Sequence, residues 1–442
     1  MKKIKLTCAH AIVKHLIAQK ILIDGKKQPL FAGAFGIFGH GNVACLGQAL
    51  EENKEELPTY RGHHEQNMAL TGIAYARAKR RQQIFVATSS VGPGSTNMVT
   101  AAAVAMSNRI PILFLPGDTY ASRMPDPVLQ QVEHFNNPSI TQNDAFKPVT
   151  KYFDRLTRPE QILQTLPQAI QTMLDPADCG PACISMAQDV QGETFEYPEE
   201  FFKETVQNIR RPRPDDFQIK KAAEKIKSSK NPIIISGGGV FYSDAMEDLA
   251  NFAEKHNIPV TQTVMGYSTM KRDHSHFLGP IGGLGGKAAN NLAKQTDLAI
   301  AVGTKLGDFT TGSWANFENE NFKLVSINVS RFDANKHLAQ AVIGDAKVSL
   351  TELSQALGSW KVGDEWNKKS QTELKSWNEH IDKESAPTNQ EIPSYVQVIG
   401  AIYRNSDPTD IAVTAAGGLV GEVVQVWRPR ELNTHETEWG FS

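Results

Sequence analysis

The sequence lacks the long apolar run, about 18 residues or more, that a membrane-spanning helix needs. Its N-terminus carries several lysines but no apolar core of the length that a signal peptide has. Only four cysteines occur in 442 residues, and they are too scattered for the disulfide framework of a secreted protein. These absences predict a cytoplasmic protein that has no membrane partner.

The chain also lacks an excess of either charge. It has 46 basic and 48 acidic residues, a net charge of -2, so no overall field attracts nucleic acid or an anionic membrane. A phosphate-bearing ligand would therefore need a local site. Hydrophobic residues at 40% and charged residues at 21% are typical of a globular protein. Because domains usually have roughly 100–200 residues, the length of 442 residues predicts two to four domains.

The most informative stretch runs from Tyr60 to Arg77 and places Glu65 in the first turn of a predicted helix. Exposed N–H groups and the positive end of the helix dipole favour a carboxylate there. Taken alone, Glu65 could be an ordinary helix-start residue worth a few tenths of a kcal/mol to about 1 kcal/mol. Spacings of three and four predict one closely packing face of small or apolar residues, made of Met68, Ala69, Gly72, Ile73 and Ala76.

A second motif follows a run at residues 84–88 that reads as a buried strand. Gly92, Pro93 and Gly94 form a turn between this strand and an alanine-rich helix. Unpaired N–H groups at such a turn can hold an anion or the edge of a cofactor, although turns of this kind are common in α/β proteins. The side chain of Asn97 can form hydrogen bonds across the turn.

The order of these motifs, ending in the Gly117-Asp118 strand end, resembles the pyrimidine-binding domain of thiamine-diphosphate enzymes of the acetohydroxyacid synthase type. Residues 38–43, 125–131 and 143–149 are more similar to the hydrolases that open a polyhydroxylated cyclic 1,2-dione in myo-inositol breakdown. That resemblance implies C–C bond hydrolysis that yields 5-deoxy-glucuronate.

The resemblance also implies the roles of individual residues. Glu65 would hydrogen-bond ring nitrogen N1′ of the cofactor, and its burial would raise its pKa. Residues Gly92, Pro93, Gly94 and Asn97 would bind thiamine diphosphate. The glycine-rich loop at 36–42 would border the substrate pocket through His40 and Asn42, whose alternative interpretation is ordinary loop polarity. The family further implies a homo-oligomer with the active site at a subunit interface.

The predicted fold class is α/β, with consecutive doubly wound parallel-sheet domains. We expect a pyrimidine-binding domain at 1–190, a linker at 191–214, a central α/β domain at 215–386 and the start of an incomplete diphosphate-binding domain at 387–442. Glycine clusters at 237–239 and 282–286 do not fit the G-x-G-x-x-G spacing of a dinucleotide site.

The family's diphosphate anchor is a Gly-Asp-Gly followed by Asn, which holds Mg²⁺ through oxygen ligands. None of the four Gly-Asp pairs, Gly117-Asp118, Gly307-Asp308, Gly344-Asp345 and Gly363-Asp364, is followed by glycine. Gly117-Asp118 with Asn143 has tolerable spacing but lies in the first domain. We therefore expect a C-terminally truncated chain that lacks the Mg²⁺ ligands, is inactive alone, and is disordered or aggregating after about Pro387.

Two other functions stay open. An acetolactate-synthase-like carboligase would share Glu65 and the Gly-Pro-Gly turn, but it would not explain residues 38–43 or 125–131. A non-catalytic assembly partner could have kept the fold and lost the site.

Overall fold

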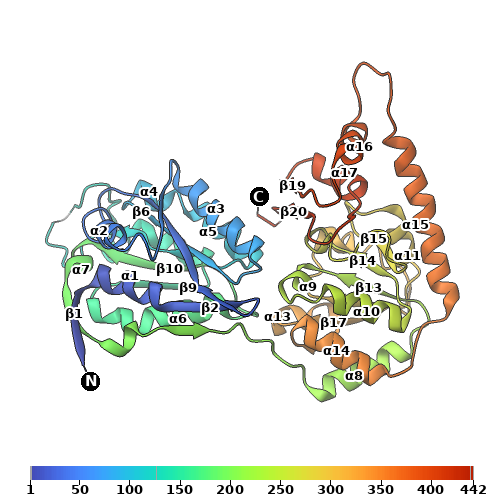
Figure 1. The fold of residues 1–442 in the computed structure, drawn as a ribbon, viewed down its shortest axis with the longest axis horizontal. Helices are drawn as coiled ribbons and strands as arrows, with labels where there is room; N and C mark the ends of the chain where they lie inside the picture. The colour runs from blue at the N-terminus through green and yellow to red at the C-terminus, as the bar shows by residue number, and fades with distance from the viewer. Residues whose placement is uncertain (1, 126, 439, 442) are drawn as a thin grey trace. The chain divides into compact units, whose positions relative to one another are not determined.

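The computed structural model describes residues 2–125, 127–438 and 440–441. Contacts divide the chain into a first unit, residues 1–210, and a second unit, residues 211–440 (Figure 1). Asp126 of the 125–131 motif and the closing residues Trp439 and Ser442 lie outside the described residues.

The first unit is built on a seven-stranded sheet with the order β5-β4-β6-β7-β10-β8, in which β9 also pairs with β10. Each pairing in this sheet is parallel. Every residue of β6 is buried, as expected for a strand covered by helices on both faces. The strands are β4 (Phe31–Ile37), β5 (Thr59–Arg61), β6 (Ile84–Ser89), β7 (Leu113–Phe114), β8 (Gly117–Asp118), β9 (Tyr152–Leu156) and β10 (Ala182–Ala187).

The predicted helical face of the Glu65 segment is confirmed. Helix α3 (Glu65–Ala78) packs on β6 and on α5, and its buried residues are the five that the spacing predicts. Helix α6 packs on β9 and β10 and also contacts α1. The other helical elements of the unit are α1 (Cys8–Ala18), α2 (Leu46–Glu52), α4 (Pro93–Thr96), α5 (Val99–Asn108), α6 (Ile162–Leu174), α7 (Gln188–Gly192) and the 3₁₀ helices η1 (Gln142–Val149), η2 (Pro159–Gln161) and η3 (Glu199–Phe202).

Residues 194–207, which fall in the expected linker, form two further strands of the first unit. β11 (Thr194–Pro198) pairs antiparallel with β1 (Lys3–Thr7). β12 (Thr205–Gln207) pairs with β2 (Gln19–Ile23), which also pairs with β3 (Lys26–Pro29). Tyr197 of β11 is fully buried and donates its hydroxyl to the Pro159 carbonyl at 3.0 Å, so this segment completes the core. The longest irregular stretch of the expected linker begins at residue 208 and continues to residue 215.

The second unit has a six-stranded parallel sheet with the order β15-β14-β13-β16-β17-β18. Helices α8, α10 and α14 pack together, and α11 and α15 form a second group. The predicted α/β class is thereby confirmed in both units. The elements are α8 (Asp216–Lys227), β13 (Pro232–Ser236), α9 (Gly238–Tyr242), α10 (Met246–His256), β14 (Val260–Gln262), η4 (Val264–Gly266), β15 (Phe277–Pro280), α11 (Lys287–Ala293), β16 (Leu298–Val302), α12 (Asp308–Thr311), β17 (Lys323–Asn328), α13 (Arg331–Ala334), η5 (Lys336–Leu338), β18 (Gln340–Ile343), α14 (Ala346–Leu357) and α15 (Asp364–Glu384).

Residues 395–438 are folded onto the second unit, contrary to the expected disorder after about Pro387. They form α16 (Tyr395–Asn405), β19 (Ala412–Thr414), α17 (Leu419–Val426) and β20 (His435–Thr437). Val423 and Val426 of α17 are buried in a cluster with Ile381 and Trp427, because α15 and α16 cover them. Part of the expected exposure remains, since Val413 is 78% exposed and Leu419 47%.

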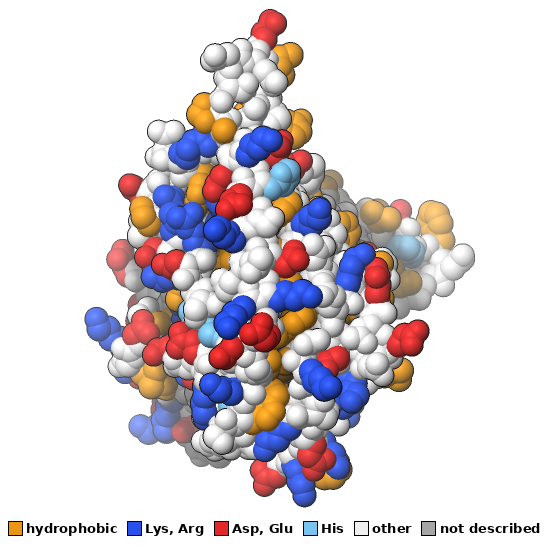
Figure 2. Space-filling model, turned by 90° about the vertical axis from the view of Figure 1, so that its right-hand side faces the viewer, with side chains coloured by type: hydrophobic (Ala, Val, Ile, Leu, Met, Phe, Trp, Pro, Cys, Tyr) orange, Lys and Arg blue, Asp and Glu red, His pale blue; other side chains and the backbone are white. Residues whose placement is uncertain are grey.

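No helix within the described residues is both long and apolar enough to cross a membrane. On the face of the second unit that carries α15, acidic and basic side chains are intermixed (Figure 2).

Candidate functional site

The predicted site residues gather at the carboxyl edge of the first sheet. From β4 the chain passes to β5 on one side and then crosses to β6 on the other side of β4. A topological switch point therefore lies between β4 and β6, where ligands bind in open parallel sheets. The His40 loop follows β4, the Gly92 turn follows β6, and α3 begins just after β5. A backbone hydrogen bond of 2.8 Å from the Val91 N–H to the His40 carbonyl joins the His40 loop to the Gly92 turn.

Glu65 occupies the first position of α3, directly after His64. The backbone of His64 is extended, and its side chain accepts a hydrogen bond from the Asn67 N–H, which caps the helix. Glu65 is half-buried and lies at the positive end of the helix dipole. The structure thus confirms the predicted position of the carboxylate.

The Glu65 carboxylate is held by one oxygen only. Nδ2 of Asn97 donates to its Oε2 at 2.8 Å. In the part of the chain that the structure describes, Oε1 has no hydrogen-bond partner. A Cβ atom added at Gly94 would lie 3.2 Å from this Oε1 and 2.5 Å from the Ser90 hydroxyl, so Gly94 leaves the approach to Oε1 open. The arrangement presents one proton-accepting oxygen at the sheet edge.

Gly92 and Pro93 shape the turn. Gly92 has φ +73°, which favours glycine, and a Cβ atom at this position would overlap the Gln130 carbonyl oxygen. Pro93 begins α4 and is exposed. Hydroxyls of Ser95 and Thr96 donate to the Gly92 carbonyl at 3.0 and 2.9 Å. The glycine at 92 is therefore required by the fold of this turn.

The two predicted substrate-pocket residues differ in their surroundings. Asn42 is buried, and its amide group donates to the Ile37 carbonyl at 3.1 Å and to the Thr88 hydroxyl at 3.2 Å while accepting from the Gly39 N–H at 2.9 Å. Its hydrogen-bonding groups are thus used inside the protein, and Asn42 fixes the loop. His40 is exposed and is the member of the pair that can reach a ligand.

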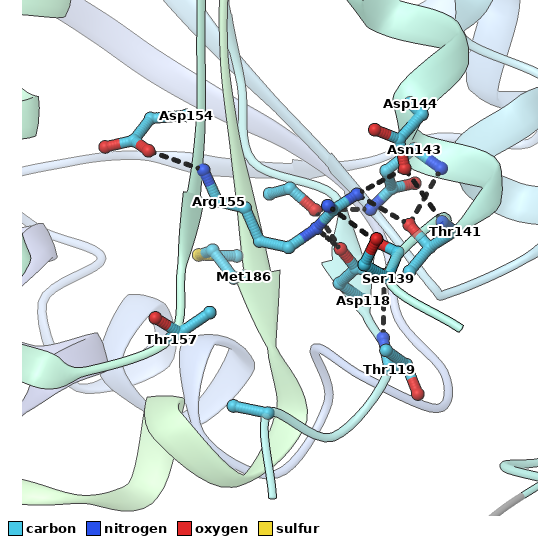
Figure 3. Close-up of polar contacts among 12 residues, drawn as sticks. Asp118, Thr119, Ser139, Thr141, Asn143, Asp144, Asp154, Arg155, Thr157 and Met186 are labelled. Atoms are coloured by element: carbon cyan, nitrogen blue, oxygen red, sulfur yellow. Dashed lines mark hydrogen bonds and ion pairs between the residues drawn. The ribbon is translucent and has the colours of Figure 1, made fainter. Parts of the chain in front are cut away.

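The structure brings Gly117-Asp118 close to Asn143, the combination considered for a metal anchor. Asp118, however, pairs with a cationic side chain. Nε of Arg155 donates to Oδ2 of Asp118 at 2.8 Å, so a guanidinium already neutralises this fully buried carboxylate (Figure 3). Asp345 accepts from the N–H groups of Lys347 and Val348 and caps α14. Among the described residues no cluster of three or more His, Cys, Asp or Glu could hold a metal ion. These residues do not fit Mg²⁺.

The glycines at 237–239 serve packing between backbones. Cβ atoms added at Gly237 and Gly239 would lie 2.5 Å from the Gly303 carbonyl oxygen and 2.6 Å from the Gly303 Cα. The loops after β13 and β16 therefore touch where a dinucleotide would have to enter.

Sequence reasoning missed three residues that shape the site: His64, Gln130 and Arg155. His64 had a local signal, because a residue directly before a helix-start glutamate is a capping candidate. Gln130 lies in the 125–131 motif, but its contact with Gly92 is not local. Arg155 offered no signal, since its acidic partners lie 37 and 11 residues away.

Two family descriptions match the chain. "Thiamine pyrophosphate enzyme, N-terminal TPP binding domain" covers residues 19–137, and "Thiamine pyrophosphate enzyme, central domain" covers residues 219–353.

Curated relatives match over the whole chain. A Clostridium tetani protein named 3D-(3,5/4)-trihydroxycyclohexane-1,2-dione hydrolase is 44% identical over 466 residues, and the match covers 100% of this chain and 72% of that protein. Proteins of the same name from Geobacillus thermodenitrificans and, as hydrolase 1, from Bacillus cereus are 43% and 42% identical with the same coverage.

Proposed function

Because this chain belongs to the thiamine pyrophosphate enzymes, and among them to the 3D-(3,5/4)-trihydroxycyclohexane-1,2-dione hydrolases, we propose that its first unit supplies the pyrimidine half of the active site. The reaction is hydrolysis of the C–C bond between the two carbonyls of the cyclic dione, which gives 5-deoxy-glucuronate. The cofactor is thiamine diphosphate, and the catalytic carboxylate is Glu65.

When bound, thiamine diphosphate supplies a nucleophilic carbon and an electron sink for C–C cleavage. The chain's own contribution is to hold a proton at Oε1 of Glu65. Asn97 fixes the other carboxylate oxygen, and the dipole of α3 favours the negative charge that Glu65 carries once it has given up this proton. Gly92, Pro93, Gly94 and Asn97 would hold the pyrimidine ring at the turn, and the described residues do not fit Mg²⁺.

The observation that carries this proposal is the carboxylate held through Oε2 with Oε1 open beside Gly94. A purely structural helix-start glutamate needs neither an amide donor across the turn nor a glycine facing its second oxygen. Exposed His40 borders the same edge and is our candidate for contact with the substrate hydroxyls. A homo-oligomer with the site at a subunit interface, implied by the family, belongs to the same proposal.

The first experiment separates the hydrolase from the carboligase. The chain is joined to the part of the Clostridium tetani relative that the match does not cover, and the product is analysed with the cyclic dione and with pyruvate. Ring-opened acid from the dione supports the hydrolase. Acetolactate from pyruvate would instead favour the carboligase, and no turnover of either would favour an assembly partner.

The second experiment substitutes Glu65→Gln in the same completed enzyme. We expect a fall in turnover of about 10²-fold or more, the size of an acid–base contribution, with unchanged thermal unfolding. Glu247→Gln is the matched control, because Glu247 also lies in the first turn of a helix, α10, where the dipole favours its charge, and its side chain is exposed. Retention of more than about a tenth of the activity by Glu65→Gln would contradict the role of Glu65.

A further inference from the structure

The described residues of 119–149 are here called the covering segment, which contacts the Gly92 turn through Gln130 and η1. The Gln130 carbonyl occupies the space that a Cβ atom of Gly92 would need. The 3₁₀ helix η1 at the end of the segment packs on α4 and α5, and its Phe146 is fully buried against Phe114 with ring centroids 5.4 Å apart. The shape of the turn thus depends on where this segment sits.

The beginning of the covering segment is fixed by one carboxylate. Asp189, in α7, accepts hydrogen bonds from the N–H groups of Ala121 and Ser122 at 2.9 and 3.0 Å. Burial alone would raise the pKa of Asp189, but these backbone hydrogen bonds lower it. At residues 123–125 and 127–138, by contrast, the backbone has little regular structure and exposes large apolar side chains such as Met124 and Phe135.

The end of the covering segment is fixed by Arg155, in edge strand β9. Its guanidinium donates to Asp118 of β8 at 2.8 Å, and to Asp144 and the Thr141 hydroxyl of the segment at 2.7 and 2.9 Å (Figure 3). It also donates to the Ser139 carbonyl at 3.3 Å. The planar guanidinium suits such a bridge, because its donors point in fixed directions toward several acceptors.

The two carboxylates that Arg155 contacts accept further hydrogen bonds. Asp118 is fully buried and accepts from the Ser185 hydroxyl at 2.5 Å, and Asn143 donates to that hydroxyl at 2.8 Å and to the Gly117 carbonyl at 2.9 Å. Asp144 accepts from the Thr141 N–H at 2.8 Å. Asn143 and Arg155 therefore connect the sheet edge to the covering segment, and Arg155 is the cation common to both carboxylates.

We propose that Arg155 is a positioning residue for the turn at residues 92–97. By attaching the covering segment to β8, it keeps the Gln130 carbonyl against Gly92 and so fixes the turn from which Asn97 holds Glu65. The binding of the pyrimidine ring by this turn rests on the proposed function above. The positioning of the turn by Arg155 does not depend on that function.

The test is amide hydrogen exchange of the 442-residue chain without cofactor. The N–H groups of Thr96 and Asn97 donate to the Gly92 and Pro93 carbonyls, so their exchange reports opening of the turn. We expect Arg155→Met to accelerate exchange at Thr96 and Asn97 at least tenfold, while amides of β16 in the second unit keep their rates. Arg155→Lys, which retains a charge for one carboxylate, is expected to recover part of the protection.

Two controls separate positioning from general destabilisation. Tyr197→Phe removes a buried hydrogen bond elsewhere in the same unit, and it should change exchange at Thr96 and Asn97 only as much as it changes exchange across that unit. Arg158→Gln removes an exposed ion pair with Glu160 and should leave exchange unchanged. If Arg155→Met does not fold, Asp144→Asn replaces it, with an expected threefold or larger acceleration at the turn.

Wild-type protection at Thr96 and Asn97 in a folded Arg155→Met variant, or in Asp144→Asn when Arg155→Met does not fold, would overturn the proposal. A second measurement tests separately whether Arg155 positions the turn and whether the turn binds the cofactor. In the completed enzyme, Arg155→Met should raise the thiamine diphosphate concentration for half-maximal activity at least fivefold. Faster exchange at the turn without this rise supports the positioning role and contradicts the assignment of the turn to the cofactor.

Discussion

The two units place glycine-rich turns at corresponding points of two parallel sheets, yet the turns do different things. In the second unit, Gly237 and Gly239 follow β13 and meet Gly303 after β16, so two backbones pack against each other at the switch point. In the first unit, Gly94 faces a carboxylate oxygen of Glu65, and Asn97 holds the other oxygen. A glycine cluster alone therefore does not identify a ligand site. The informative feature is a polar side chain with an unused hydrogen-bonding atom beside the glycine.

The largest expected effect concerns the binding of thiamine diphosphate. Among the described residues, neither sheet has an anchor for the diphosphate at its edge. Asp118 pairs with Arg155, and Asp345 caps α14, so neither carboxylate is available to Mg²⁺. Pyrimidine contacts contribute roughly 0.5–1.5 kcal/mol per hydrogen bond against an association cost of at least about 4 kcal/mol. We expect the 442-residue chain to bind thiamine diphosphate with Mg²⁺ at best in the millimolar range, about 10³-fold weaker than micromolar binding.

Titration calorimetry with thiamine diphosphate and Mg²⁺ measures this affinity directly. Thiamine without its diphosphate is the control, because it retains the ring contacts and removes the charge. A dissociation constant in the low micromolar range for thiamine diphosphate would show that the chain contains an anchor.

The substitution Gly239→Ala tests the packing role of the second unit's glycines. The new Cβ would lie 2.6 Å from the Gly303 Cα, and backbone atoms cannot rotate away. We expect a loss of about 2–3 kcal/mol in the free energy of unfolding of the second unit, typical of overpacking, measured by urea unfolding. Gly418→Ala is the control, since Gly418 has helical φ and ψ and open space around its Cα. An unchanged stability for Gly239→Ala would contradict the closed switch point.

The substitution Gly94→Ala tests the corresponding glycine of the first unit, and here we expect function to change more than stability. Its Cβ would approach a hydroxyl and a carboxylate oxygen, which are ends of side chains that can rotate. In the completed enzyme we expect a fall in kcat of about tenfold, because Glu65 is displaced from its position, and a stability change below about 1 kcal/mol. A variant that lost stability but kept its turnover would assign Gly94 to packing, as in the second unit.

The smallest effect is the acid sensitivity of the Arg155 cluster. Burial alone would raise the pKa of Asp144, but hydrogen bonds from Lys147, the Thr141 N–H and Arg155 outweigh it and lower the pKa from 3.8 to about 2. A lowered pKa in the folded protein adds stability that is present above about pH 4 and is lost as the pH falls toward about 2.

Asp144→Asn should therefore reduce the free energy of unfolding of the first unit by about 1 kcal/mol at pH 7, after allowance for partial exposure. The difference from wild type should close between about pH 4 and pH 2. Urea unfolding at a series of pH values measures it. A difference that stayed constant down to pH 2 would mean that the carboxylate's charge does not stabilise the fold.

Much of the fold could be predicted because local periodicity encodes it. The five buried residues of α3 follow from spacings of three and four, and the fully buried strand β6 follows from its apolar run. The position of Glu65 at a helix start was likewise a local property. Pairings between distant segments were not predictable in this way. β11 looked like linker because nothing in residues 194–198 shows that β1 is its partner.

The sequence by itself determined the fold class, the family and the position of the candidate catalytic carboxylate. Each rests on order and spacing within short segments, where the geometry of helix and strand is fixed. Only the tertiary structure decided which atoms those segments present to one another. The open oxygen of Glu65, the contact of Gln130 with Gly92, and the neutralisation of Asp118 by Arg155 all depend on sheet register and on contacts between distant residues. Burial makes an unpaired charge costly, so Asp118 needs a cation, but nothing local in the sequence identifies Arg155 as that cation.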